Sequence, residues 1–298
     1  MTADRWERRT GHIESDGFTL QYIVEGRGPT ALVVGSALYY SRTFSQNLRS
    51  HLRLAFVDHR GFAPGNTCTD RERYRLELLL EDMELARERL DLGRVIVVGH
   101  SGHAFLALEY AKRYPDRVSH VVLLGAAPSY SARAHAAGER SFAEAVCPER
   151  KAALAANLST LDERIRRAPE KAFITFCLAM GPKSWFDPHF DATPLWEGVE
   201  VNMTMFDYVW GRVFRDIDIT RGLERLRAPV WIGLGRFDYL VPPAYLWEEV
   251  RERFPDLTLR VFDRSAHAPQ LEEPEAFDAE LLSWLQSKAA AVTKPAER

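Results

Sequence analysis

A serine in a glycine-containing turn is the first residue of this sequence that could do covalent chemistry. Residues 99–103 read Gly-His-Ser-Gly-His, after the apolar, β-branched run of residues 95–98 and before the helix-like pattern of residues 104–108. A strand, a Gly-x-Ser turn and a helix in this order are typical of a nucleophile elbow, which presents the serine hydroxyl above the edge of a sheet. The sequence therefore predicts Ser101 as a nucleophile, against the alternative of a surface serine in a tight turn.

Two further residues supply what a serine nucleophile needs. A serine hydroxyl requires a base, and the base requires an acid that fixes its tautomer. Asp238 follows a buried strand-like segment, residues 229–235, and His267 follows the alternating segment 257–262. The chain order serine, acid, histidine is that of the nucleophile-elbow hydrolases. We therefore predict a catalytic triad of Ser101, Asp238 and His267 for acyl transfer.

Other histidines and carboxylates fit these roles less well. His100 lies inside the turn and is expected to point away from the site, and His59 is expected to belong to a loop-stabilising cluster. The segment after residues 121–124 contains no carboxylate, which leaves Asp238 as the acid. The acidic residues near His267 are interpreted as solvated charges of the loop and of the following helix start: Asp263, Glu272 and Glu273.

Alternating strand-like and helix-like segments must position these residues. Amphipathic helical patterns cover residues 76–92 and 245–254, and a closing helix is expected from Pro274 to about Leu285. Seven segments read as strands: 18–24, 31–34, 54–57, 95–98, 118–124, 230–234 and 257–262. This alternation predicts an α/β protein with a mostly parallel central sheet covered by helices on both faces.

Residues 128–228 interrupt the alternation, because they lack strand signals and show helical spacing, for example over 154–165 and 169–179. We predict that they form a helical lid inserted over the active site. Residues 1–127 and 229–298 are then the core that carries the triad.

The predicted lid is rich in aromatic residues, most of which are expected to form its own core. A few, with Trp185 among them, are expected to close an apolar pocket over the serine. His135 and His189 could touch substrate, although an exposed position is the default for both. Three acidic residues are candidates to hold a substrate ammonium, against the interpretation that they are solvated lid charges: Glu197, Glu200 and Asp207.

Composition and charge indicate an ordinary soluble enzyme. The 298 residues carry a formal charge of −3 and give a pI near 6.3, so there is no basic field for nucleic acid or an anionic membrane. The charged amino terminus leads into no apolar signal core, and no run of about 18 apolar residues exists to cross a bilayer. Three widely spaced cysteines offer neither metal-ligand spacing nor a disulfide framework: Cys68, Cys147 and Cys177. These features predict a cytoplasmic protein with a small-molecule substrate and no metal or cofactor, and they do not distinguish a monomer from a homo-oligomer.

From Phe18 to Leu285 the chain resembles the α/β-hydrolases, and most closely the lid-bearing group that includes the prolyl aminopeptidases. The resemblance implies the α/β-hydrolase fold and an oxyanion loop after the strand at 31–34. In the family this loop often reads His-Gly-Gly-Pro-Gly, whereas residues 35–40 here read Gly-Ser-Ala-Leu-Tyr-Tyr. Counting from the strand end, the N–H of Ala37 is expected to bind the oxyanion together with the N–H of Gly102.

The turn departs from the family pattern at its last position, where His103 stands in place of the usual glycine. The sizes of residues 102 and 103 are exchanged relative to the family pattern, because Gly102 is small at a position that is normally bulky. His103 is expected to fill space under the oxyanion loop, near Ser36 or Tyr39, with direct contact to substrate as the alternative. His103 and Tyr39 are both assigned to the substrate pocket.

These residues predict a serine hydrolase that cleaves a small, partly apolar ester, thioester or amide through an acyl-enzyme. The serine argues against the haloalkane dehalogenase and epoxide hydrolase branches of the resembled family, which use an aspartate nucleophile. A prolyl aminopeptidase is the more specific alternative, although the oxyanion loop lacks its signature. A lyase with Tyr39, Tyr40 or Lys183 as extra pocket groups is a further alternative, as is a non-catalytic ligand receptor, against which an intact triad argues.

Overall fold

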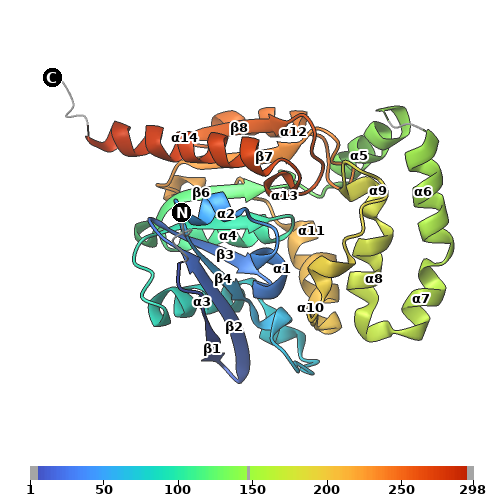
Figure 1. The fold of residues 1–298 in the computed structure, drawn as a ribbon, viewed down its shortest axis with the longest axis horizontal. Helices are drawn as coiled ribbons and strands as arrows, with labels where there is room; N and C mark the ends of the chain where they lie inside the picture. The colour runs from blue at the N-terminus through green and yellow to red at the C-terminus, as the bar shows by residue number, and fades with distance from the viewer. Residues whose placement is uncertain (1–5, 146–147, 294–298) are drawn as a thin grey trace, which may run out of the picture.

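The computed structural model describes residues 6–145 and 148–293. An eight-stranded sheet forms its centre, with the strand order β1-β2-β4-β3-β5-β6-β7-β8 (Figure 1). β2 pairs antiparallel with β1 and with β4, and all other neighbouring pairs are parallel. The strands are β1 (Arg9–Ser15), β2 (Phe18–Gly26), β3 (Thr30–Gly35), β4 (Arg53–Asp58), β5 (Val95–His100), β6 (Val118–Leu124), β7 (Val230–Gly235) and β8 (Leu257–Phe262).

Seven of these strands lie where the sequence predicts them, so the mostly parallel α/β sheet is confirmed. β1 is the one strand that the sequence analysis missed. Its residues are mostly polar and exposed, and only Ile13 and Ser15 are buried, so the strand gives little hydrophobic signal. A hairpin signal was nevertheless present, because Asp16 and Gly17 form the β1–β2 turn with φ values of +51° and +81°.

Helices cover the sheet on both faces, and every residue of β5 and β7 is buried. Full burial is expected for parallel strands between two helical layers. The helices of the core include α1 (Ala37–Ser41), α2 (Gln46–Arg49), α3 (Leu76–Arg89), α4 (His103–Arg113), α12 (Tyr245–Glu248), α13 (Pro269–Glu272) and α14 (Pro274–Thr293).

Two predicted helices of the core differ from the observed ones. The helix expected over 245–254 is only the single turn α12, followed by a separate 3-10 turn at Arg251–Arg253. The closing helix α14 runs to Thr293, beyond the predicted end near Leu285.

A group of helices lies between β6 and β7 along the chain, and we call α5 to α11 the inserted helices. Figure 1 shows them gathered beside the sheet core, in green to orange. They are α5 (Ala132–Ala145), α6 (Pro148–Ser159), α7 (Leu161–Arg167), α8 (Ala172–Ala179), α9 (Gly181–Ser184), α10 (Met203–Tyr208) and α11 (Phe214–Asp216), with a π-helical turn at Val209–Val213 before α11. The helix expected over 154–165 is divided at Thr160 into α6 and α7. Within the described part of 128–228, no strand is present, as the sequence predicts.

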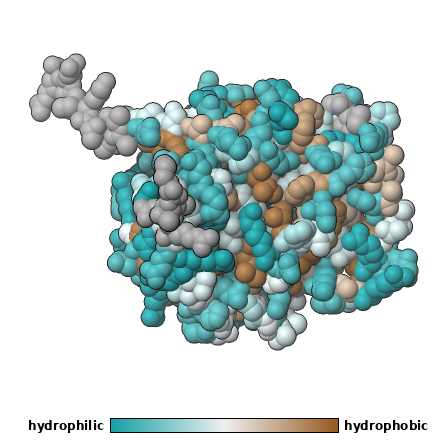
Figure 2. Space-filling model, viewed as in Figure 1, coloured by the Kyte–Doolittle hydropathy of each residue, from teal (hydrophilic) through white to brown (hydrophobic). Residues whose placement is uncertain are grey.

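The surface between the sheet core and the inserted helices is more apolar than its surroundings. Figure 2 shows hydrophobic residues in the middle of this face, while its periphery is mainly hydrophilic. The apolar surface lies on the side of the sheet core that faces the inserted helices, where the carboxyl ends of β5, β7 and β8 carry the predicted triad residues.

Candidate active site

Ser101 lies at the sharp turn between β5 and α4. Its φ of +57° is left-handed, a conformation that is costly for a residue with a side chain and that clusters at functional turns. The Ser101 N–H donates to the Leu124 carbonyl at 2.8 Å, which ties the turn to β6. Gly99 is required before it, because a Cβ there would lie 2.2 Å from the His103 carbonyl oxygen. The backbone therefore has the strand–turn–helix geometry of a nucleophile elbow.

His267 is held through three of its four polar atoms. Its N–H donates to the Ser184 carbonyl at 2.9 Å, its carbonyl accepts from His100 Nε2 at 2.8 Å, and its Nδ1 donates to Asp238 Oδ2 at 2.8 Å. Nε2 is the remaining atom, and the ring lines the same cavity as Ser101. This arrangement leaves one imidazole nitrogen to exchange a proton with a group in that cavity.

Asp238 lies in the loop after β7, and both of its carboxylate oxygens are engaged. Oδ1 accepts from the N–H groups of Leu240 at 3.0 Å and Val241 at 3.2 Å, and Oδ2 accepts from His267. The side chain is only 4% exposed. A carboxylate fixed in this way can orient an imidazole and stabilise its positive charge. The structure thus places Asp238 and His267 in contact from the loops after β7 and β8.

Two carboxylates near His267 are not the solvated charges that their places in the sequence predict. Glu272 accepts hydrogen bonds from the N–H groups of Phe186 at 2.6 Å, Ala266 at 2.8 Å and Ala268 at 3.3 Å. Burial raises the pKa of Glu272, and these backbone hydrogen bonds oppose the rise. Glu273 accepts from the Arg264 N–H at 2.7 Å and the Ser265 hydroxyl at 2.6 Å. Both carboxylates therefore fix the loop that carries His267, and Glu272 also ties this loop to the inserted helices.

A cavity of about 430 Å³ contains both Ser101 and His267 in its wall. Its lining comes partly from the sheet core and partly from the inserted helices, so the cavity lies between them. Aromatic rings form much of the wall, including Tyr39, Phe62, Phe173, Trp185, Trp196 and Trp210. Among the described residues that line it there is no Asp or Glu, and Arg215 is the one Lys or Arg. Such a wall suits an apolar, uncharged group.

The pocket assignments made from the sequence divide into two groups. Tyr39, His103 and Trp185 line the cavity, as expected. The three acidic candidates do not line it: Glu197, Glu200 and Asp207 are all exposed and lie outside its lining, which agrees with solvated lid charges rather than with a site for a substrate ammonium. Glu200 instead accepts from the Gly65 N–H at 2.8 Å. These carboxylates stay in solvent because a buried charge without a partner is costly.

The expected oxyanion donor Ala37 is also corrected. Its N–H donates to Asp58 Oδ1 at 2.7 Å, and Ala37 is fully buried outside the cavity lining. Ser36, one position earlier, lines the cavity. Within the described residues, neither the Ser36 N–H nor the Gly102 N–H has a hydrogen-bond acceptor. Counting from the strand end leads to Ala37, because such a count does not include the Asp58 contact.

His103 lies beneath the oxyanion loop, as expected, but contacts Tyr40 rather than Ser36 or Tyr39. Its Nδ1 is 2.9 Å from Tyr40 Oη and its Nε2 is 3.2 Å from His59 Nε2. His59 does stabilise its own loop, since its Nδ1 accepts from the Gly61 N–H at 3.1 Å. The sequence does not predict the contact between these buried rings, because Tyr40 lies in α1, His59 in the loop after β4 and His103 at the start of α4.

The remaining candidates are placed as follows. His135 lines the cavity, whereas His189 is exposed and lies outside its lining. Cys177 lines the cavity too, and burial raises the pKa of its thiol to about 12, which keeps it protonated. Cys147 lies outside the described residues. In the part of the chain that the structure covers, no cluster of His, Cys, Asp and Glu could hold a metal ion. None of the helices described there is long and apolar enough to span a membrane.

Comparison with known proteins gives consistent results. A family profile described as "alpha/beta hydrolase fold" matches residues 28–274. The AB hydrolase superfamily protein YclE of Bacillus subtilis is 43% identical over 277 residues, which are 93% of this chain and 99% of that protein. A proline iminopeptidase of Heyndrickxia coagulans is 25% identical over 308 residues, covering 93% of this chain and 98% of the relative. The solved structure of a proline iminopeptidase from Mycobacterium smegmatis superposes with a TM-score of 0.72 at 17% identity, over 95% of this chain and 100% of that one.

Proposed function

The chain belongs to the alpha/beta hydrolase family, and from this premise we propose that it is a serine hydrolase of small, partly apolar esters. The observation that carries the proposal is the placement of His267. Three of its polar atoms are held, and its ring shares the wall of one cavity with Ser101, at the apex of a strained turn.

The proposed mechanism is acyl transfer through a covalent intermediate. His267 Nε2 takes the proton of the Ser101 hydroxyl as its oxygen attacks the carbonyl carbon, and Asp238 stabilises the imidazolium that forms. His267 then returns the proton to the leaving oxygen, and a water molecule releases the acyl group by the same steps. Such serine–histidine contacts commonly tighten only in the substrate complex.

For the oxyanion we propose the N–H groups of Gly102 and Ser36. Both residues adjoin the cavity region of Ser101, and both N–H groups are without an acceptor in the described structure. Gly102 stands at the start of α4, where the helix dipole also favours a negative charge. Ser36 replaces Ala37 in this role, because the Ala37 N–H is already bound by Asp58.

The cavity wall favours esters over peptides with a free amine. Binding an ammonium in such a site needs a carboxylate, and loss of a buried charge partner costs roughly 2–5 kcal/mol. The described lining holds no carboxylate, and the three acidic candidates from the segment between β6 and β7 are exposed outside it. The similarity to proline iminopeptidases supports an aminopeptidase as the second candidate. A lyase that uses Lys183 is disfavoured, since its ammonium pairs with Glu139 at 2.8 Å and lies outside the cavity lining.

A labelling and turnover experiment tests the proposal. The wild-type protein should react with a fluorophosphonate probe and hydrolyse p-nitrophenyl acetate and butyrate faster than proline p-nitroanilide. Ser101→Ala should lose both labelling and turnover, whereas Ser50→Ala, at the end of α2, should keep both.

Labelling of the Ser101→Ala protein at the wild-type level would refute the nucleophile. Faster cleavage of the anilide than of either ester would promote the aminopeptidase instead. If the wild-type protein neither reacts with the probe nor hydrolyses any ester or anilide, the result would point to the lyase or receptor alternatives.

A further inference from the structure

Four buried aromatic side chains form a continuous hydrogen-bonded series next to Ser101, and we call them the ring chain. His59 Nε2 is 3.2 Å from His103 Nε2, His103 Nδ1 is 2.9 Å from Tyr40 Oη, and Tyr40 Oη is 3.3 Å from His100 Nδ1. His100 and His103 flank Ser101 at the end of β5 and the start of α4. The mechanism proposed above uses none of these four side chains.

The two ends of the ring chain fix the direction of its hydrogen bonds. At one end the Gly61 N–H donates to His59 Nδ1 at 3.1 Å, so this nitrogen carries a lone pair. At the other end the His267 carbonyl can only accept, so His100 Nε2 must carry a hydrogen in its 2.8 Å contact. The tautomers of the two terminal histidines are therefore set by backbone groups.

The intermediate contacts follow from these ends. Neutral His59 donates from Nε2 to His103 Nε2, and His103 then donates from Nδ1 to the Tyr40 oxygen. The Tyr40 hydroxyl donates to His100 Nδ1, with the His100 carbonyl at 3.4 Å as a weaker acceptor. Every ring thus gives one hydrogen bond and accepts one, and no polar atom of the series conflicts with its neighbour.

The ring chain carries no charge in the ordinary pH range. Burial lowers the pKa of His59 to about 3, with Arg60 adding to the effect, and lowers the pKa of His100 to about 3, with His267 adding to it. Burial and the neighbouring histidines hold the pKa of His103 well below its usual value, and burial raises that of Tyr40. The series cannot pass a proton along, since the Gly61 amide takes none and the His267 carbonyl gives none.

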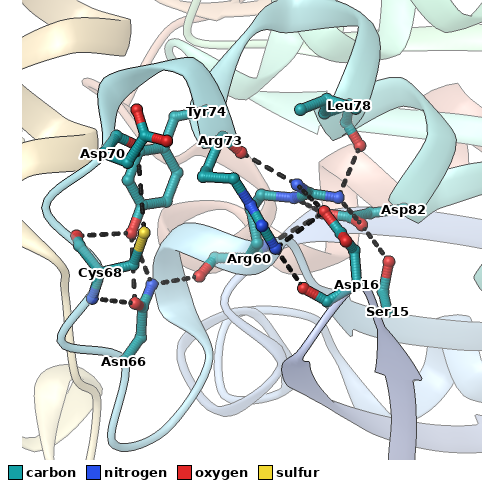
Figure 3. Close-up of polar contacts among 10 residues, drawn as sticks. All are labelled: Ser15, Asp16, Arg60, Asn66, Cys68, Asp70, Arg73, Tyr74, Leu78 and Asp82. Atoms are coloured by element: carbon teal, nitrogen blue, oxygen red, sulfur yellow. Dashed lines mark hydrogen bonds and ion pairs between the residues drawn. The ribbon is translucent and has the colours of Figure 1, made fainter.

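The far end of the ring chain is anchored to the fold. Arg60, next to His59, donates to both carboxylate oxygens of Asp82 on α3, at 2.8 and 2.7 Å, and to the Arg73 carbonyl at 2.9 Å (Figure 3). Asn66 donates to the Arg60 carbonyl at 2.7 Å and closes the same loop. The His59 end is therefore a fixed point, and the opposite end is the peptide of His267.

We propose that the ring chain positions His267. Its rings are neutral and hydrogen-bond in one direction. They hold the carbonyl of the general base against the anchored loop after β4. The assignment of His267 as the base rests on the proposed function. The series complements the contact of Asp238 with the His267 ring and that of Ser184 with the His267 N–H, so the peptide is held from both sides. Tyr40, His100 and His103 also line the cavity, but the effect proposed here reaches the reacting atoms through His267, so we call the four side chains positioning residues.

The first test measures the tautomers directly. Nitrogen-15 NMR of the labelled protein near pH 6 should show His59 and His100 neutral with the hydrogen on Nε2, and His103 neutral with the hydrogen on Nδ1. Assignment uses the single His→Gln variants. A charged His100 or His103 at this pH, or His103 with its hydrogen on Nε2, would overturn the ring chain whatever the enzyme's activity.

The second test separates hydrogen bonding from packing. In His100→Gln the side-chain amide can donate to the His267 carbonyl and accept from Tyr40. The leucine side chain of His100→Leu can do neither. We expect kcat for ester hydrolysis to fall roughly 10- to 100-fold in His100→Leu with KM little changed, and to be largely restored in His100→Gln. His120→Leu and His120→Gln are the matched controls, since His120 lies in β6 with its Nδ1 unpartnered within the described residues.

Tyr40→Phe keeps the test decisive if His100→Leu does not fold, because it removes one oxygen from the middle of the series. It should lower kcat in the same direction with fluorophosphonate labelling slowed but complete. Wild-type kcat in both Tyr40→Phe and His100→Leu would overturn the positioning role. Equal kcat for His100→Leu and His100→Gln would assign the residue to packing alone. Neither outcome would affect the proposed function, which fails separately if Ser101→Ala retains labelling.

Discussion

The function expected of Asp238 depends on hydrogen bonds that a carboxylate can make and an amide cannot. Asp238 accepts two backbone N–H groups through Oδ1 and His267 Nδ1–H through Oδ2. An asparagine would keep the size of this side chain but would place an N–H donor in the site if its amide nitrogen faced His267. The His267 ring would then favour the tautomer with the hydrogen on Nε2, which cannot accept a proton from Ser101.

Asp238→Asn should therefore lower kcat for ester hydrolysis by roughly 10³- to 10⁴-fold, with a smaller effect on KM. Steady-state kinetics with p-nitrophenyl butyrate measure this. The matched control is Asp263→Asn, because Asp263 also lies in the loop after β8 but is exposed and pairs with Arg236. A drop of similar size in the control would show that the loop, not the contact to His267, is responsible.

The nucleophile, acid and base candidates could be named from the sequence, because each follows a strand and each has a residue type with few substitutes. Ala37 was chosen by counting along one loop, and the structure shows that its N–H is bound by Asp58 from the next strand. Glu272 and Tyr40 were not recognised for the same reason. Their partners, Phe186 and His103, are distant in sequence, and no local pattern encodes such contacts.

At the scale of elements, the Glu272 carboxylate connects the loop after β8 to the inserted segment, in addition to the contact of the His267 N–H with Ser184. Glu272 accepts from Phe186 in the inserted segment and from Ala266 and Ala268 on both sides of His267. A glutamine has only one acceptor oxygen and must turn its amide nitrogen toward at least one of these N–H groups. The Ala266 and Ala268 contacts are part-buried, and an unsatisfied donor there costs up to about 1–3 kcal/mol, whereas the Phe186 contact is exposed.

Glu272→Gln should therefore lower both the melting temperature and kcat, because the loop with His267 loses part of its support. Thermal unfolding and ester turnover are the two measurements. Glu275→Gln, exposed in the first turn of α14, is the control and should change neither. A Glu272→Gln protein with a normal melting temperature and normal turnover would contradict this function of the carboxylate.

Elements with a strong repeating pattern were predicted, and elements whose limits depend on packing were not. The strands of the parallel sheet are short runs that are either apolar or alternate apolar with polar residues, so their predicted bounds agree with the observed ones within one or two residues. The helix expected over 245–254 instead ends after Glu248, and a 3-10 turn follows before β8. No residue in this stretch signals that end. β1 is an edge strand with one buried apolar residue, Ile13, and its stability comes from pairing with β2.

At the scale of the whole molecule, one buried carboxyl group should contribute to the pH dependence of stability. Asp58, 2% exposed, ends β4 and accepts from the N–H groups of Ala37 at 2.7 Å and Gln21 at 3.3 Å. Burial raises the pKa of Asp58 to about 7, and the two backbone hydrogen bonds act in the opposite direction. The folded protein therefore binds this proton more tightly than the unfolded chain does.

The sign of the effect follows from this difference. The contribution of Asp58 to the free energy of unfolding is fully present below about pH 4 and is lost as the pH rises through about 7, by at most about 4 kcal/mol. Urea unfolding at several pH values between 4.5 and 8 measures it. In Asp58→Asn this component should vanish, while the buried histidines, whose lowered pKa values act in the opposite direction, are the same in both proteins. The free energy of unfolding of the wild type minus that of the variant should therefore fall as the pH rises from 4.5 to 8. An equal pH dependence in the two proteins would refute the assignment.

The polar outer strand β1 has a consequence for how the protein behaves in concentrated solution. An edge strand offers unpaired backbone groups to another chain, and charged side chains along it discourage such pairing. β1 carries Arg9, His12 and Glu14 in exposed positions and covers the edge of β2, whose residues Ile23 and Val24 are buried. Removal of residues 1–15 would leave β2 as the new edge. Light scattering should then show aggregation of the shortened protein under conditions in which the full chain stays dispersed.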